Sequence, residues 1–166
     1  IEVQLGGNAY NFSVNLRQLG WRQGHLACLG AVGTDYFGEL FRRELVNHNV
    51  NPLISVIPDE RTSKNIILQV VGEERRYHYD EGANTHLNLD YVVARIQELR
   101  PDLLCIGEVG SLGVTGKHLR RILETAKSVN CLTVGDIVIP PPQKVDTFVK
   151  FVKELQGLSI STMLNL

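Results

Sequence analysis

Apolar residues follow two alternating patterns along most of the chain. In five segments an apolar residue recurs every three or four positions, which is the spacing of one helix face. We predict helices over 7–19, 35–47, 88–99, 115–127 and 143–155, with Asp35 as a cap of the second. Short apolar runs typical of buried strands alternate with them, at 25–32, 103–107, 131–135 and 158–164. This alternation predicts βαβ units and a parallel sheet covered by helices on both faces.

The pattern changes between residues 53 and 80, where Val, Ile, Thr and Tyr dominate. Segments 62–71 and 74–79 read as two strands joined at a Gly-containing turn. We therefore predict an antiparallel insertion at 53–80 within an α/β core made of 1–52 and 81–166.

The composition limits the classes of protein to consider. The 166 residues are 43% hydrophobic and 21% charged, as in soluble globular domains. The formal net charge of −1 gives no positive field to collect nucleic acid, and no apolar run reaches the roughly 18 residues of a membrane span. Cys28, Cys105 and Cys131 lie far apart in apolar runs, which argues against disulfides and zinc and fits a reducing, cytoplasmic setting. We expect no nucleic-acid partner, no membrane and no metal site.

The richest local chemistry lies in the segment Gly6-Gly7-Asn8-Ala9-Tyr10-Asn11, where the first helix begins. Paired glycines let a ligand approach the backbone, and the free N–H groups of a first helical turn can face a hydroxyl or an anion. Asn8 and Asn11 lie three apart on one side of that turn, and each amide both donates and accepts, as a sugar hydroxyl does. The pattern is typical of a polyol clamp, and equally of a helix start with ordinary Gly and Asn caps.

A longer spacing adds to this picture. Gly6-Gly7 is followed by Asn11, Ser13 and Gly20, and then by the segment 30–38 (Gly-Ala-Val-Gly-Thr-Asp-Tyr-Phe-Gly). Together they resemble the N-terminal signature of the ribokinase-like carbohydrate kinases, also called the phosphofructokinase B family. Segments 72–75 (Gly-Glu-Glu-Arg) and 82–84 (Gly-Ala-Asn) resemble the turn of that family's lid hairpin and the segment that returns from it.

The resemblance implies a Rossmann-like three-layer α/β/α fold with a small antiparallel β lid. It implies an enzyme that transfers a phosphoryl group from ATP, with Mg²⁺, to a hydroxyl of a small sugar or nucleoside. Lid edges in the family commonly pair between subunits, so the resemblance also makes a homodimer through the lid an expectation. The implied substrate-binding residues are Gly6, Gly7, Asn8, Asn11, Tyr79, Glu108 and Asp136. Two alternatives stay open. Glu108 could be a solvated loop carboxylate, and Tyr79 could pack on the domain.

Two departures from the family pattern shape the interpretation. Where members often carry Asp-Pro-Asn-x-Arg, this chain has Asp136-Ile137-Val138-Ile139-Pro140. The missing Arg, a bidentate ligand for carboxylate or phosphate, favours a neutral sugar or nucleoside, or a degenerate site. The family's Gly-Ala-Gly-Asp segment, which forms the anion hole and supplies the catalytic base, is absent, and Asn165 matches only the first residue of the family's phosphate- and Mg²⁺-organising Asn-x-x-Glu.

We therefore expect the chain to be the N-terminal, substrate-binding half of a sugar kinase whose C-terminal part is missing. No catalytic residue is expected within it, and most of the ATP and Mg²⁺ site would lie outside it. The competing hypothesis is a non-catalytic relative with a binding or regulatory role. A Rossmann dehydrogenase is disfavoured because Gly6-Gly7-Asn8 does not supply Gly-x-Gly-x-x-Gly.

Overall fold

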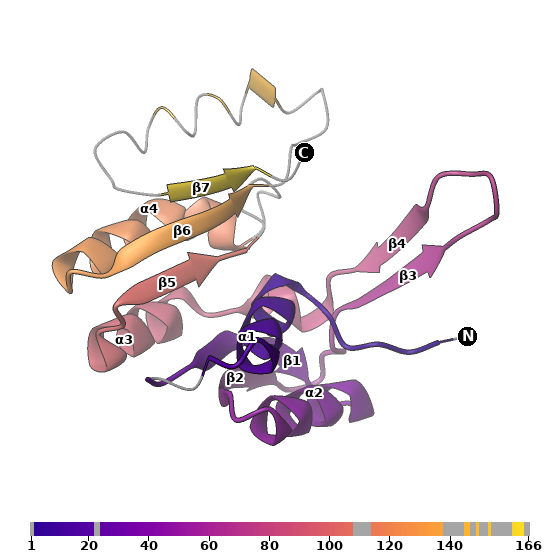
Figure 1. Ribbon diagram of the computed structural model, residues 1–166, viewed down its shortest axis with the longest axis horizontal. Helices are drawn as coiled ribbons and strands as arrows, with labels where there is room; N and C mark the ends of the chain where they lie inside the picture. Colours follow the sequence, from indigo (N-terminus) through magenta and orange to yellow (C-terminus); the bar gives the residue numbers. More distant parts are fainter. Residues whose placement is uncertain are drawn as a thin grey trace. The chain divides into compact units, whose positions relative to one another are not determined.

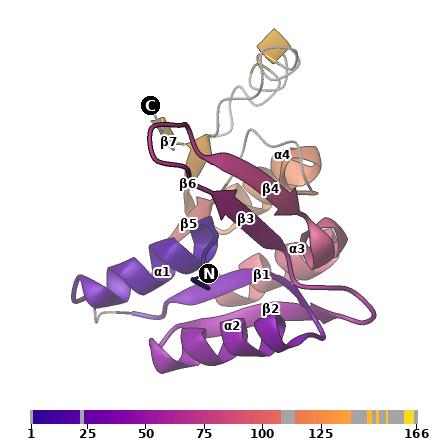
Figure 2. The same ribbon diagram turned by 90° about the vertical axis from the view of Figure 1, so that its right-hand side faces the viewer.

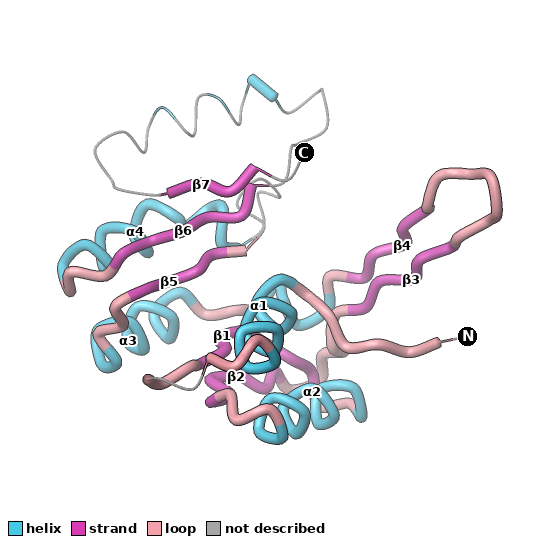
Figure 3. Tube along the Cα trace, viewed as in Figure 1, coloured by secondary structure: helices cyan, strands magenta, loops and turns pink. Residues whose placement is uncertain are grey.

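The chain folds as two compact units, Ile1–Leu87 and Asn88–Leu166 (Figure 1). The computed structural model describes residues 2–21, 24–107, 114–137, 145–146, 149, 153 and 161–164. Figure 3 shows helices and strands in both units, with the hairpin of β3 and β4 in the first.

The first unit is built on two parallel strands with helices packed against them. It contains α1 (Asn8–Gln18), β1 (Ala27–Gly33), α2 (Tyr36–Asn47) and β2 (Asn51–Ile57). β1 pairs with β2 from Ala27↔Asn51 to Gly33↔Ile57. The two helices meet at the rings of Tyr10 and Phe41, whose centroids lie 5.1 Å apart. One cluster of its core consists of the buried Cys28, Leu45 and Val50, with Tyr10, Leu26, Phe41 and Ile54 packed against it.

Asp35 caps α2, as the sequence predicts. Its backbone is extended, and its side chain accepts a hydrogen bond from the Gly38 amide at 3.0 Å. The cap satisfies one of the amides that a helix start leaves without an intrahelical partner. Asp35 lies between the end of β1 at Gly33 and the start of α2 at Tyr36, so the turn between the two elements is short.

An antiparallel hairpin of β3 (Lys64–Leu68) and β4 (Arg76–Asp80) follows β2, and the 3₁₀ helix η1 (Gly82–His86) leads back to the core. Residues 53–57, which the sequence pattern places in the insertion, form part of β2 and pair with β1. The hairpin ladder therefore starts at Lys64, eleven residues beyond the expected boundary. The cause is composition, because β2, β3 and β4 are all rich in β-branched or aromatic residues, which favour strands. The division into core and lid otherwise stays a prediction.

The second unit contains α3 (Leu89–Leu99), β5 (Leu103–Ile106), α4 (Val114–Ser128), β6 (Leu132–Ile137) and β7 (Ser161–Leu164). The strands form a parallel sheet in the order β5-β6-β7. Asn88 caps α3 by accepting from the amides of Asp90 and Tyr91. The buried hydrophobic residues of the two helices include Val92, Val93, Ile96, Leu119, Ile122, Leu123 and Ala126. The helix predicted over 143–155 lies largely outside the described residues.

The three cysteines are free thiols in or beside core strands. Cys28 lies in β1, Cys105 in β5 and Cys131 directly before β6. The pKa of the Cys28 thiol is raised to about 11, because the effect of burial outweighs the lowering by a hydrogen bond with Ser13. Cys28 is therefore protonated near neutral pH, as expected of a packing residue rather than a nucleophile. Within the ranges described above, no helix is both long enough and apolar enough to cross a bilayer.

Candidate functional site

The turn that opens α1 exposes bare backbone. Gly7 has φ 92°, a conformation that favours glycine, and its carbonyl accepts the first bond of the helix from the Asn11 amide at 2.9 Å. Gly6 has no such backbone requirement, and a Cβ built at either glycine would meet no atom of the described residues within 4 Å. Internal packing therefore does not explain the absence of a side chain at Gly6, and the space above both glycines is open.

Two amide side chains belong to the same turn. Asn8 is half-buried and Asn11 is exposed. The buried Ser13 hydroxyl donates to the carbonyl of Ala9 at 2.7 Å. The first backbone N–H groups of α1 have no partner four residues earlier within the helix, so they point out of its start. The turn thus combines backbone donors with amide groups that donate and accept, the combination that suits a polyhydroxylated ligand.

This turn lies at the carboxyl edge of β1 and β2. In Figure 2, α1 runs against the direction of β1, so its start lies toward the end of that strand. The hairpin leaves the core after the end of β2, and it projects from the same side of the unit as the segment that leads into α1 (Figures 1 and 2). In open α/β sheets, ligands bind outside the carboxyl ends of the strands.

Tyr79 occupies β4 near the base of the hairpin. About half of its surface is exposed. The Ser63 hydroxyl donates to the Tyr79 phenol oxygen at 3.1 Å, and the Asn84 amide donates to it at 3.2 Å. The phenol oxygen is therefore already engaged by the two chain segments at the hairpin base, and the exposed ring is the part that remains for a ligand.

A cluster around Asp35 was not recognised as a unit from the sequence. The Thr62 hydroxyl donates to Asp35 Oδ1 at 2.6 Å, the Thr62 amide donates to Oδ2 at 3.0 Å, and Lys64 Nζ lies 3.5 Å from Oδ2. Burial raises the pKa of Asp35, but the hydrogen bonds from Thr62 and Gly38 and the charge of Lys64 outweigh it and lower the pKa to about 2. Asp35 is therefore a carboxylate near neutral pH. It joins the β1–α2 turn to the base of β3.

The other predicted site residues fall in the second unit. Asp136 lies near the end of β6, half-buried and opposite Met163 of β7. That position is the carboxyl end of the strand, where polar side chains of parallel sheets meet ligands. Glu108 and Asn165 lie outside the described residues.

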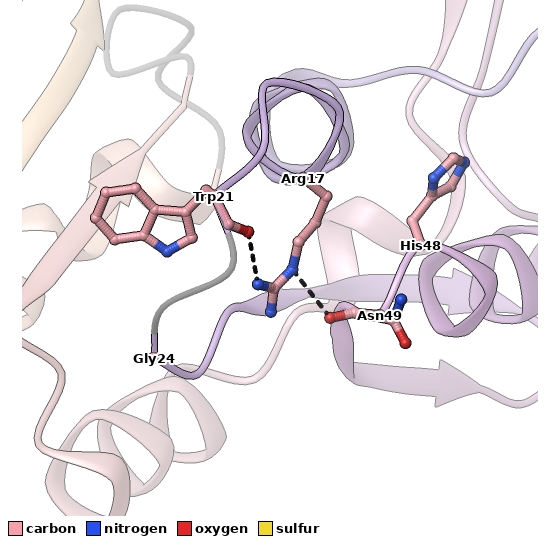
Figure 4. A pocket seen from close by; sticks show the side chains of 5 residues that line it. All are labelled: Arg17, Trp21, Gly24, His48 and Asn49. Atoms are coloured by element: carbon pink, nitrogen blue, oxygen red, sulfur yellow. Dashed lines mark hydrogen bonds between the residues drawn. The ribbon is translucent and has the colours of Figure 1, made fainter.

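A hollow on the first unit lies elsewhere. It is lined by Arg17, Trp21, Gly24, His48 and Asn49 (Figure 4). The Arg17 guanidinium donates to the carbonyls of Asn49 at 3.2 Å and Trp21 at 2.9 Å. Arg17 thereby satisfies carbonyls that follow α2 and α1. The hollow is at the C-terminal end of α1, about 16 Å along the helix from its first turn, so we assign it a structural role.

The described residues lack the features that hold ATP and Mg²⁺. The part of the chain that the structure describes contains no group of three His, Cys, Asp or Glu side chains suited to a metal ion. The sequence carries neither Gly-Ala-Gly-Asp nor Gly-x-x-x-x-Gly-Lys to hold a triphosphate. We therefore assign no step of phosphoryl transfer to the described residues.

Comparison with solved structures gives the same fold. The chain superposes on a ribokinase II of Escherichia coli with TM-score 0.77 and 16% identity, covering 96% of this chain and 51% of that one. Ribokinase of Giardia lamblia superposes with TM-score 0.73 and 19% identity, covering 97% of this chain and 48% of that one. Adenosine kinase of Schistosoma mansoni, solved with adenosine, superposes with TM-score 0.75 and 14% identity, covering 95% of this chain and 46% of that one. The chain thus spans about half the length of these structures. The Escherichia coli protein has also been solved with ATP and Mg²⁺.

These features define a ribokinase-like α/β fold, as the sequence resemblance implies. The sequence matches the pfkB family of carbohydrate kinases over residues 1–159, and the chain belongs to that family. A comparison with curated proteins finds no match. The family is one of carbohydrate kinases, and the solved structures that share the fold include a ribokinase and an adenosine kinase.

Proposed function

We propose that this chain forms the substrate-binding half of an ATP-dependent kinase that phosphorylates a hydroxyl of a small sugar or nucleoside. The observation that carries the proposal is the open turn at Gly6 and Gly7, where internal packing leaves Gly6 unexplained. The hairpin projects from the same side of the unit. It would supply the lid that excludes water during phosphoryl transfer.

The residues of the turn would bind hydroxyls in complementary ways. Backbone N–H groups at the start of α1 donate to hydroxyl oxygens, while Asn8 and Asn11 donate and accept. Glu108 and Asp136 would accept from further hydroxyls, and the Tyr79 ring would pack on an apolar face of the ligand. The stretch 136–140 (Asp-Ile-Val-Ile-Pro) offers no guanidinium, so we favour a neutral acceptor over a sugar acid or sugar phosphate.

We propose ATP and Mg²⁺ as cofactors because the chain belongs to this family and because the Escherichia coli relative has been solved with both. When bound, they would supply the transferred phosphoryl group and the charge that stabilises it. Asn165 would organise phosphate and Mg²⁺, and the catalytic base would come from chain beyond this half. The altered stretch at 136–140 favours one second candidate, a non-catalytic relative that binds the same small molecules in a regulatory role.

We further propose a cytoplasmic protein that forms a homodimer through the hairpin. A two-stranded ribbon is marginal on its own in water, and this one carries large apolar side chains on both faces. Exposed residues of β3 and β4 include Ile66, Ile67, Leu68, Tyr77 and Tyr79. A second copy would cover one face and leave the other for the substrate. Sedimentation of the native protein tests this, and Leu68→Lys should then lower the dimer fraction.

The test of substrate binding is a thermal-shift panel of neutral sugars, sugar acids and nucleosides with the native protein that carries this chain. A ligand at one hundred times its Kd should stabilise the protein by about 2.7 kcal/mol. Asn11→Ala should weaken binding about tenfold, the effect of one lost hydrogen bond. Asn15→Ala, one turn further along α1 and exposed, is the matched control. Failure of every compound to shift the melting temperature, or equal binding by both variants, contradicts the proposal.

A further inference from the structure

The base of the hairpin sits in a socket made by glycines. A Cβ at Gly33 would overlap the Glu60 carbonyl and lie 2.7 Å from the Thr62 amide nitrogen. A Cβ at Gly38 would lie 2.9 Å from the Thr62 hydroxyl oxygen, and one at Gly82 would overlap the Arg61 carbonyl. All three glycines are thus needed where residues 60–62 cross the core.

Thr62 is the centre of that socket. It is 8% exposed. Its hydroxyl donates to Asp35 Oδ1 at 2.6 Å and accepts from the Gly33 amide at 3.1 Å, and its amide donates to Asp35 Oδ2 at 3.0 Å. Both oxygens of the Asp35 carboxylate therefore accept hydrogen bonds from one residue, Thr62, at the start of the hairpin.

The returning segment is bonded to the same place. The Ala83 amide donates to the Arg61 carbonyl at 2.8 Å, and Tyr79 links Ser63 to Asn84 through its phenol oxygen. Beyond Lys64, by contrast, the described β3 and β4 side chains up to Tyr79 are exposed. The attachment is thus concentrated at the base, and the rest of the ribbon projects from it.

We propose that Asp35 is a positioning residue that holds Thr62, fixes the base of the hairpin on the β1–α2 turn, and so sets the ribbon over the start of α1. The proposal rests on the proposed function, in which the hairpin is the lid. A fixed base limits the orientations the ribbon can adopt. If the base is loosened, a smaller fraction of molecules has the ribbon in the closing position, and the apparent affinity for the acceptor falls by that fraction.

Hydrogen exchange of the native protein without ligand tests the positioning directly. Thr62→Val removes the hydroxyl at nearly constant volume, Thr62→Ser keeps it, and Thr34→Val removes an exposed hydroxyl beside Asp35 as the control. We expect the amides of Lys64–Leu68 and Arg76–Asp80 to exchange about tenfold faster in Thr62→Val alone, with β1 amides unchanged. Unchanged hairpin exchange, or an equal rise throughout β1 and β2, overturns the proposal.

Kinetics give the second readout. With the acceptor found by the binding panel, Thr62→Val should raise KM about tenfold and change kcat less than twofold, and Thr62→Ser should restore KM. An unchanged KM overturns the proposal. If the native protein phosphorylates no acceptor, the proposed function fails, and the exchange result still decides the role of Asp35. Should Thr62→Val not fold, Asp35→Asn is measured in its place against the same two criteria.

Discussion

Replacing Gly33 by alanine should destabilise the first unit through a clash that no side-chain rotation can relieve. The new Cβ would overlap the Glu60 carbonyl oxygen and lie 2.7 Å from both the Arg61 carbonyl carbon and the Thr62 nitrogen. All three neighbours are backbone atoms, so the base of the hairpin must move. Forcing a methyl group into a filled space costs about 1–3 kcal/mol, and restriction of the unfolded chain returns only about 0.4–1 kcal/mol. We expect a net loss of about 1–2 kcal/mol.

Gly30→Ala is the matched control, three positions earlier in the same strand. Its Cβ would lie 3.7 Å from Ile54 Cδ1, which is ordinary van der Waals contact. Urea unfolding followed by the fluorescence of Trp21, the only tryptophan, reports on the unit that contains both glycines. The midpoint for Gly33→Ala should fall by about 1 M, while that for Gly30→Ala should stay near the wild-type value. Equal midpoints for the two variants would refute the reasoning.

Two further predictions concern local stability. Because the pKa of Asp35 is lowered from 3.8 to about 2 on folding, its carboxylate stabilises the protein above about pH 5. About 1–2 kcal/mol, discounted for partial exposure, should be lost as the pH falls toward 2, and Asp35→Asn should remove this dependence in urea titrations at pH 7 and pH 3. Asn88→Ala should cost about 1 kcal/mol by uncapping α3, visible as a lower melting temperature, whereas exposed Asn65→Ala should not.

Spacing along the chain was sufficient to predict most helices and strands. The described α-helices begin and end within one residue of the predicted ranges, and the described strands other than β2, for which no separate strand was predicted, within three. The reason is that burial repeats with the period of the backbone, so an apolar face is visible in the sequence. The cap at Asp35 was also predictable, since a cap is a local hydrogen bond.

Contacts between distant residues were not predictable in this way. Thr62 reads as the start of a strand, and nothing in its neighbours indicates that its hydroxyl meets Asp35, 27 positions earlier. β2 was merged with the hairpin because propensity cannot say which strand a β-branched run will pair with. The Tyr79 phenol oxygen likewise finds its partners, Ser63 and Asn84, only once the hairpin has closed.

The glycines of the family signature divide into two kinds that the sequence cannot separate. Gly33 is bare because the chain itself fills the space where a Cβ would lie, whereas the space at Gly6 is open among the described residues. Gly6→Ala should therefore leave the free energy of unfolding unchanged within about 0.5 kcal/mol, yet lower the affinity for the acceptor at least tenfold, because the methyl group would occupy the place of the ligand. Titration of the native protein and of the variant with the same sugar or nucleoside measures this. A variant that binds as tightly as the wild type would show that the open turn is not where the ligand lies.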